Sequence, residues 1–134
     1  MRSERRLRRL VVDGPVAGGT AVFLWSVRHR HSTEGPCQEV LALRRDGRTT
    51  RLVFRGGEGR FVPDGFLHSG CVAVRGQGTL NLHEPGVVRA FIDEAARHGL
   101  LPGAGSGPES GPGSAELDGW ELFPAVAAGR AADR

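Results

Sequence analysis

Two histidines, His29 and His31, stand two residues apart in a segment with the composition of a strand. Residues at this spacing in a strand point to the same face, with α-carbons about 7 Å apart, so both imidazoles can reach one ion. Imidazole nitrogen and thiolate sulfur are the atoms that zinc prefers as ligands. The same atom types are offered elsewhere by Cys37, His68, Cys71 and His83.

We take His29, His31, Cys37 and His68 as candidate metal ligands, although their spacing follows no recognised zinc motif. The alternative is that His29 and His31 end a strand where its apolar face meets water, while His68 and His83 hydrogen-bond within loops. Because a cluster of mixed ligands stays a hypothesis until its geometry is known, we expect no cofactor, with zinc as the alternative.

A cysteine nucleophile is the second chemistry that the residue types permit. His68 or His83 would act as base for Cys71, and Asp64 or Glu84 would orient that base. Cys71 begins the apolar run CVAV, however, and a free cysteine usually behaves as a small buried hydrophobe. Cys71, His68 and His83 are therefore candidate catalytic residues in a protein that we expect to be non-catalytic.

Arginines form the third group with possible chemistry. The strand pattern places five of them on one sheet face: Arg28, Arg30, Arg44, Arg51 and Arg55. The guanidinium fork binds two phosphate oxygens at once, so this face is a candidate anion or nucleic-acid site. The chain has no Tyr, and its two Trp are not interleaved with these arginines, so a base-stacking platform is missing. A solvated sheet face is the alternative.

One amphipathic helix is predicted at residues 84–99. Val87, Val88, Phe91 and Ile92 recur at spacings of three and four, which creates an apolar stripe along one side. Pro85 suits the first helical position, and glycine at position 99 suits the left-handed residue after the last turn. The helix must therefore lie with this stripe on an apolar surface.

The sequence around Asp46-Gly47 predicts a β-hairpin, because this dipeptide favours a two-residue turn with positive φ. The resulting register places six residues on the core face: Leu43 opposite Thr50, Leu41 opposite Leu52, and Glu39 opposite Phe54. The opposite face pairs Arg44 with Thr49, Ala42 with Arg51, Val40 with Val53, and Gln38 with Arg55. Since side chains alternate across a strand, the second set should face solvent.

Further short strands are expected at residues 5–12, 20–31, 60–62 and 70–75. We predict an α+β domain at 1–101, with an antiparallel sheet of about five or six short strands and the helix on one face. A small, partly open β-barrel with a helix is the alternative. Residues 102–115 are rich in Gly, Pro and Ser and are expected to be a linker, 116–124 a C-terminal edge strand of the same domain, and 125–134 a disordered tail.

Composition limits the class of protein. The chain has 134 residues, which fits one domain, and its formal net charge is +3. Residues 1–60 hold 13 Arg and 6 acidic residues, whereas residues 61–134 hold 5 Arg and 9 acidic residues, and this asymmetry favours self-association. Two cysteines are too few for a disulfide framework. No apolar run reaches the roughly 20 residues of a membrane span.

We therefore expect a cytoplasmic, non-catalytic binding or protein-interaction domain that forms a homodimer or binds another protein. A zinc-type metal-binding protein or a Cys/His enzyme is the alternative. Nucleic-acid binding through the arginine face is a further alternative, and no membrane partner is expected.

Overall fold

The computed structural model describes residues 7–13, 20–31, 33–45, 47–63, 69–101 and 114–132. The strands are β1 (Arg8–Asp13), β2 (Thr20–Arg30), β3 (Gln38–Arg45), β4 (Arg48–Arg55), β5 (Arg60–Phe61), β6 (Cys71–Val74), β7 (Gly78–Asn81) and β8 (Ser114–Asp118). The helices are α1 (Pro85–Arg97), the 3-10 helix η2 (Gly119–Glu121) and α2 (Phe123–Ala132).

The main sheet has five strands in the order β1-β2-β3-β4-β8. Strands β1 to β4 are antiparallel neighbours, whereas β8 runs parallel to β4 at the sheet edge. The C-terminal segment therefore adds an edge strand to its own chain. The sheet is therefore mixed and not all antiparallel as expected. A parallel pair requires a long crossover connection, and the chain between β4 and β8 supplies it.

A second, smaller sheet contains β5, β6 and β7, paired as antiparallel neighbours. Its last strand, β7, is not among the strands expected from the sequence, and the glycine-rich Val74–Gly78 segment forms the tight turn that leads into it. Gly76 and Gly78 both adopt positive φ in this turn, as glycine does without steric strain. The described strands thus form two sheets and no closed barrel, which confirms the α+β class.

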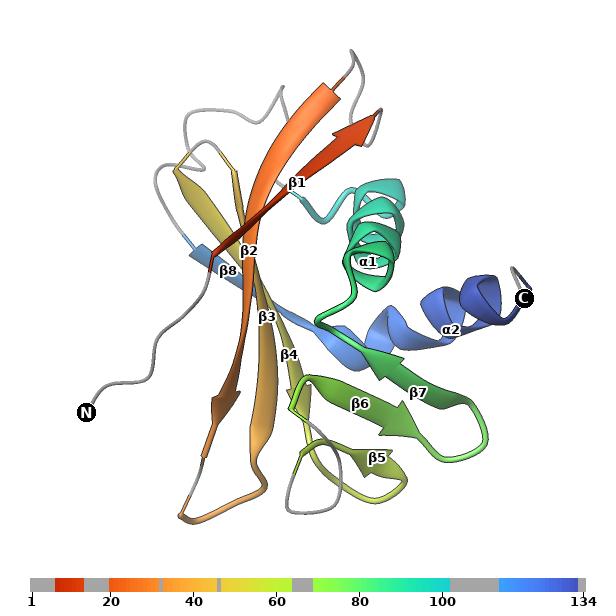
Figure 1. Cartoon of the computed structure of the whole chain (residues 1–134). Coiled ribbons are helices and arrows are strands. Elements are labelled where there is room, and N and C mark those ends of the chain that lie inside the picture. The colour runs from red at the N-terminus through yellow and green to blue at the C-terminus, as the bar shows by residue number, and fades with distance from the viewer. Residues whose placement is uncertain are drawn as a thin grey trace.

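The helices and the small sheet lie together on one side of the main sheet, and none of the described helices lies on the other side (Figure 1). The core between these layers contains Trp25 and Phe54 from the main sheet and Phe91 from α1, each with at most 1% of its surface exposed. Phe54 contacts Phe91 edge-on, with ring centroids 5.5 Å apart. The main sheet and helix α1 therefore share one apolar core.

Helix α1 confirms the predicted helix within two residues at each end. Pro85 occupies the first turn, and glycine at position 99 has φ of +70° just beyond the last turn. The residues that face the sheet are buried: Val87, Val88, Phe91, Ile92 and Ala95. The apolar stripe thus packs on the sheet as its periodicity predicted.

The hairpin of β3 and β4 has the predicted register throughout. All six core-face residues are buried, including Glu39 and Thr50. On the opposite face Arg44 and Arg55 are exposed and Arg51 is half-buried, whereas Val40 is fully buried. Arg30 on β2 forms an ion pair with Glu116 on β8, with 3.6 Å between Nη2 and Oε2, so the two side chains together bridge β3 and β4. Val40 lies on a central strand of the sheet, where the register places it between Arg28 and Val53, so its short side chain is flanked on both sides.

The C-terminal region differs most from the expectation. The edge strand ends at Asp118, and helix α2 occupies residues that were expected to be a disordered tail. Its sequence AVAAGRAA is rich in alanine, the strongest helix former, and Pro124 lies in the first turn, where proline is tolerated. Phe123 and Val126 are buried, so core packing fixes the helix.

No helix in the described part of the chain is both long enough and apolar enough to cross a membrane.

Candidate metal centre

The connection between β2 and β3 brings three potential metal ligands together. His29 lies near the end of β2, His31 directly follows β2, and Cys37 directly precedes β3. One ligand atom from each residue lies within 4.8 Å of the others. In a tetrahedral zinc site, ligand atoms are about 3.3 to 3.6 Å apart, as follows from zinc–ligand distances of about 2.0 to 2.3 Å. Small side-chain rotations would therefore bring all three atoms onto one ion.

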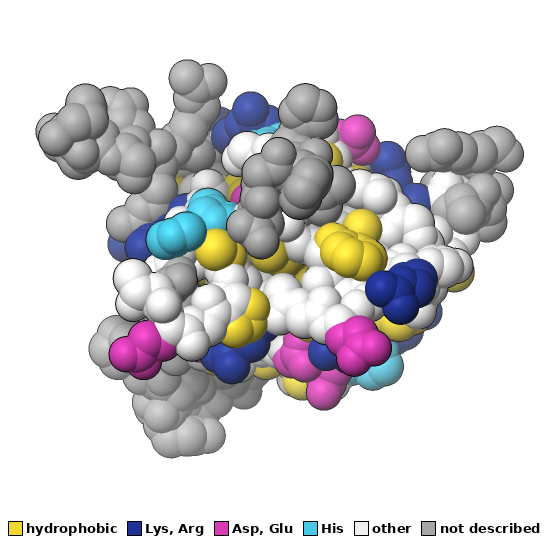
Figure 2. Space-filling view, turned by 90° about the horizontal axis from the view of Figure 1, so that it is seen from below, with side chains coloured by type: hydrophobic (Ala, Val, Ile, Leu, Met, Phe, Trp, Pro, Cys, Tyr) yellow, Lys and Arg dark blue, Asp and Glu magenta, His cyan; other side chains and the backbone are white. Residues whose placement is uncertain are grey.

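The pair formed by His31 and Cys37 is already in contact. Cys37 Sγ and His31 Nδ1 are 3.2 Å apart. The backbone of Cys37 is fixed as well, because its carbonyl accepts a hydrogen bond of 3.0 Å from the amide of Gly56, which follows β4. Cys37 is buried, whereas His29 and His31 are exposed. Histidine side chains also reach the surface in the view of the molecule from below (Figure 2). The cluster thus has a buried sulfur and two imidazoles accessible to solvent.

Glu39 supports the cluster from the core side. It lies opposite His29 in the β2–β3 register, and its Oε1 is 2.8 Å from His29 Nδ1. Its Oε2 accepts a hydrogen bond of 2.9 Å from the backbone amide of Gly70, next to β6. Burial raises the pKa of Glu39 above its ordinary value, and the hydrogen bonds from His29 and Gly70 act in the opposite direction. Glu39 therefore links the cluster to the second sheet.

The environment of Cys71 does not favour a nucleophile. Burial raises the pKa of its thiol, and the charges of Glu39 and Glu84 raise it further, so the reactive thiolate is disfavoured at neutral pH. Glu84 forms an ion pair with Arg130. Within the described residues, no hydrogen bond joins Cys71 to His83. The remaining members of this candidate group, His68 and Asp64, lie outside the described residues, as does the possible role of His68 as a metal ligand.

The five candidate anion-binding arginines share the face of the main sheet on which none of the described helices lies, which we call the uncovered face. Register and alternation place Arg28 and Arg30 of β2, Arg44 of β3, and Arg51 and Arg55 of β4 on this face. Arg30 is paired with Glu116 and donates to Gln38 Oε1. Arg28, Arg44 and Arg55 are exposed, and Arg51 is half-buried. The structure thus brings the predicted set together, with one member already in an ion pair.

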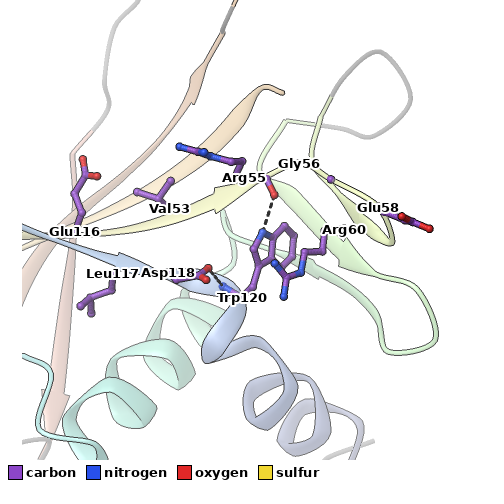
Figure 3. Close-up of a pocket in the computed structure, with 10 residues that line it drawn as sticks. Val53, Arg55, Gly56, Glu58, Arg60, Glu116, Leu117, Asp118 and Trp120 are labelled. Carbon is purple, nitrogen blue, oxygen red and sulfur yellow. Dashed lines mark hydrogen bonds between the residues drawn. The ribbon is translucent and has the colours of Figure 1, made fainter. Parts of the chain in front are cut away.

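A cavity of about 500 Å³ lies beside this face, between the end of β4, β8 and η2 (Figure 3). The Trp120 indole closes one side and donates its Nε1–H to the Arg55 carbonyl at 2.8 Å. Asp118 Oδ1 accepts from the Trp120 backbone amide at 3.0 Å, and the Arg60 guanidinium lies 5.8 Å from the indole ring. Trp120 Nε1 and one Asp118 carboxylate oxygen are thus already engaged in hydrogen bonds within the protein, and these bonds fix the wall of the cavity.

Glu39 and Gly70 are site residues that we did not identify from the sequence. A signal for Glu39 was present, because the hairpin register placed this carboxylate on the core face, where a charged group needs a partner. The contact with Gly70 joins residues 31 positions apart, so no local pattern indicates it.

The structure defines an α+β domain with a mixed five-stranded sheet and a His/Cys cluster at the end of its central strands. No family model, curated protein or solved structure matches the chain.

Proposed function

We propose that this protein binds one zinc-type divalent metal ion through His29, His31 and Cys37. The observation that carries the proposal is the approach of three ligand atoms to within 4.8 Å of one another. Two imidazoles and a thiolate suit zinc better than calcium or magnesium, which prefer oxygen ligands. Three protein ligands leave a fourth coordination position for water, for a small molecule or for a further residue.

The contact between His29 and Glu39 supports the same proposal. A ligating imidazole commonly donates its second ring N–H to a carboxylate, which fixes the tautomer and the ring orientation. Glu39 lies within hydrogen-bond distance of His29 Nδ1, so Nε2 is left as the nitrogen with the free lone pair. Because Glu39 is fully buried and also bound by the Gly70 amide, it holds His29 in one position.

Metal content and affinity of the purified protein test the proposal. We expect one zinc ion per chain, bound through sulfur, so that cobalt substitution produces a thiolate-to-cobalt charge-transfer band. His31→Ala and Cys37→Ala should each lower zinc affinity at least tenfold, and Cys37→Ala should also abolish that band because it removes the sulfur ligand. His98→Ala and Cys71→Ala are the matched controls, since these residues lie outside the cluster, and both should keep the wild-type affinity. A wild-type protein without zinc affinity would contradict the proposal.

The 3.2 Å contact of Cys37 with His31 favours a second candidate, a thiol nucleophile paired with a histidine. In this case alkylation of Cys37 by iodoacetamide in metal-free protein would be fast near neutral pH and would slow in His31→Ala. Equal alkylation rates of Cys37 in the two proteins would exclude this candidate.

A further inference from the structure

The uncovered face of the main sheet is strongly basic. Four of its arginines lie on three neighbouring strands: Arg28 on β2, Arg44 on β3, and Arg51 and Arg55 on β4. Strands lie about 4.8 Å apart and alternate residues about 6.8 Å apart, so these four positions cover an area of about 10 by 20 Å. The guanidinium groups therefore form a patch rather than isolated charges.

The acidic residues on the same face do not neutralise this patch. The register places Glu116 opposite Arg51 and Asp118 opposite Val53. Glu116 is already paired with Arg30, and Asp118 accepts the Trp120 amide. Among the described residues, none forms an ion pair or a hydrogen bond with the side chain of Arg28, Arg44, Arg51 or Arg55. Four guanidinium forks thus remain available to an anionic partner.

We propose that this patch, composed of Arg28, Arg44, Arg51 and Arg55, binds the phosphate backbone of double-stranded nucleic acid. A duplex carries one negative charge per about 1.7 Å, so 20 Å of its length presents roughly a dozen phosphates. This charge density, with release of condensed counterions, makes a duplex a better partner for four adjacent arginines than an acidic protein surface. The planar guanidinium fork also matches two phosphate oxygens.

The composition of the face determines the mode of binding. None of the residues that the register places on it beside the arginines is aromatic, so unpaired bases find no stacking platform there. The patch contacts phosphates and reads no base edges. We therefore expect duplex binding without sequence preference, and weaker binding of single strands.

Fluorescence anisotropy with a labelled random-sequence DNA duplex tests this inference. Four phosphate contacts predict a slope of about −3.6 in the logarithm of affinity against that of salt concentration. Affinity should therefore fall about 150-fold between 50 and 200 mM salt. No binding at 50 mM salt, or binding that is insensitive to salt, would overturn the proposal.

Matched variants locate the site. Arg44→Gln with Arg51→Gln should weaken duplex binding at least tenfold and make the salt slope less steep by about two. Arg75→Gln with Arg97→Gln removes the same charge from exposed residues of the β6–β7 turn and α1, which lie on the other side of the main sheet (Figure 1), and should change affinity less than threefold. Equal losses in the two double variants would overturn the assignment to this face. Poly-glutamate that competes as well as duplex would assign it to an acidic polypeptide instead.

Discussion

Glu39 is a fully buried carboxylate whose oxygens are both engaged, one by His29 Nδ1 and one by the Gly70 amide. Burying a charge is unfavourable unless partners replace the lost water, and these two contacts supply that replacement. Desolvation nevertheless outweighs these two contacts, so the pKa of Glu39 is raised above its ordinary value of 4.5. Glu39 thus holds the candidate ligand His29 in place, but the folded protein is less stable when the Glu39 carboxyl is ionised than when it is protonated.

Glu39→Gln tests this balance in metal-free protein. A raised folded-state pKa means that the contribution of Glu39 to stability is complete below about pH 4.5 and is lost as pH rises through the folded-state pKa. The free energy of unfolding of the wild type, relative to the variant, should therefore decrease as pH rises above 4.5. Urea unfolding between pH 4 and 8 measures it. Glu58→Gln, at an exposed loop position, is the control, and a pH-independent difference for Glu39→Gln would contradict the prediction.

The β3–β4 hairpin shows how an element positions both candidate sites. Its register places Glu39 on the core face, near the metal cluster, and Arg44 and Arg51 on the uncovered face. Because alternate residues point to opposite faces, a shift by one residue would exchange the two sets. Gly47, with φ of +78° between the two strands, and the apolar residues on the core face together prevent this shift.

Leu41→Ala should lower the free energy of unfolding by about 2 to 5 kcal/mol, since it leaves a cavity at a fully buried position of β3. Leu24→Ala provides a matched control on β2, because Leu24 is 37% exposed on the uncovered face. Its effect should stay within about 0.5 kcal/mol. Similar losses in chemical denaturation of the two variants would show that the faces are assigned incorrectly.

Helix α2 is an element that sequence patterns did not predict. Phe123 at its start is fully buried and lies with its ring centroid 5.7 Å from that of Trp120. Phe123→Ala should therefore destabilise the protein by about 3 to 5 kcal/mol. Phe61→Ala, at a position 42% exposed, should have an effect below about 1 kcal/mol. A Phe123→Ala variant that melts like the wild type would mean that the C-terminal residues do not dock.

At the scale of the whole molecule, the cluster of His29, His31 and Cys37 lies where three parts of the chain meet. His29 lies near the end of β2 and Cys37 directly before β3, Gly56 holds Cys37 from just after β4, and Gly70 holds Glu39 from beside β6 of the second sheet. A ligand that binds there stabilises the folded state over the unfolded chain. Metal binding should therefore raise the stability of the whole domain.

Zinc at a free concentration 100 times its dissociation constant should stabilise the fold by about 2.7 kcal/mol. For a domain of this size this corresponds to a Tm increase on the order of 10 °C. Differential scanning calorimetry measures the shift. Cys37→Ala should lose it, whereas Cys71→Ala should keep it, and equal shifts in both variants would place the metal elsewhere.

The homodimer remains a prediction that depends on the opposite net charges of residues 1–60 and 61–134. Strand β8 pairs with β4 of its own chain, so the C-terminal segment is already docked without a second copy. The mass in solution at high protein concentration decides whether the oppositely charged halves still favour association.

Local patterns determined those parts of the fold in which interacting residues are close in sequence. The three- and four-residue spacing from Val87 to Ala95 determined helix α1 and its buried face. The Asp46-Gly47 dipeptide in the sequence predicted the β3–β4 register, and with it the shared face of Arg44, Arg51 and Arg55. Each of these features follows from backbone periodicity, which the sequence displays directly.

Only the tertiary structure decided how distant segments meet. The approach of Cys37 to His31 depends on the path of the β2–β3 connection, and the contact of Glu39 with Gly70 depends on the packing of the two sheets. The parallel β4–β8 pair likewise joins segments more than 60 residues apart, and Arg130 of helix α2 meets Glu84, 46 positions away. Such contacts form where the whole chain buries the most apolar surface. The free energy of this burial is a sum over all segments, so no single stretch of sequence reveals it.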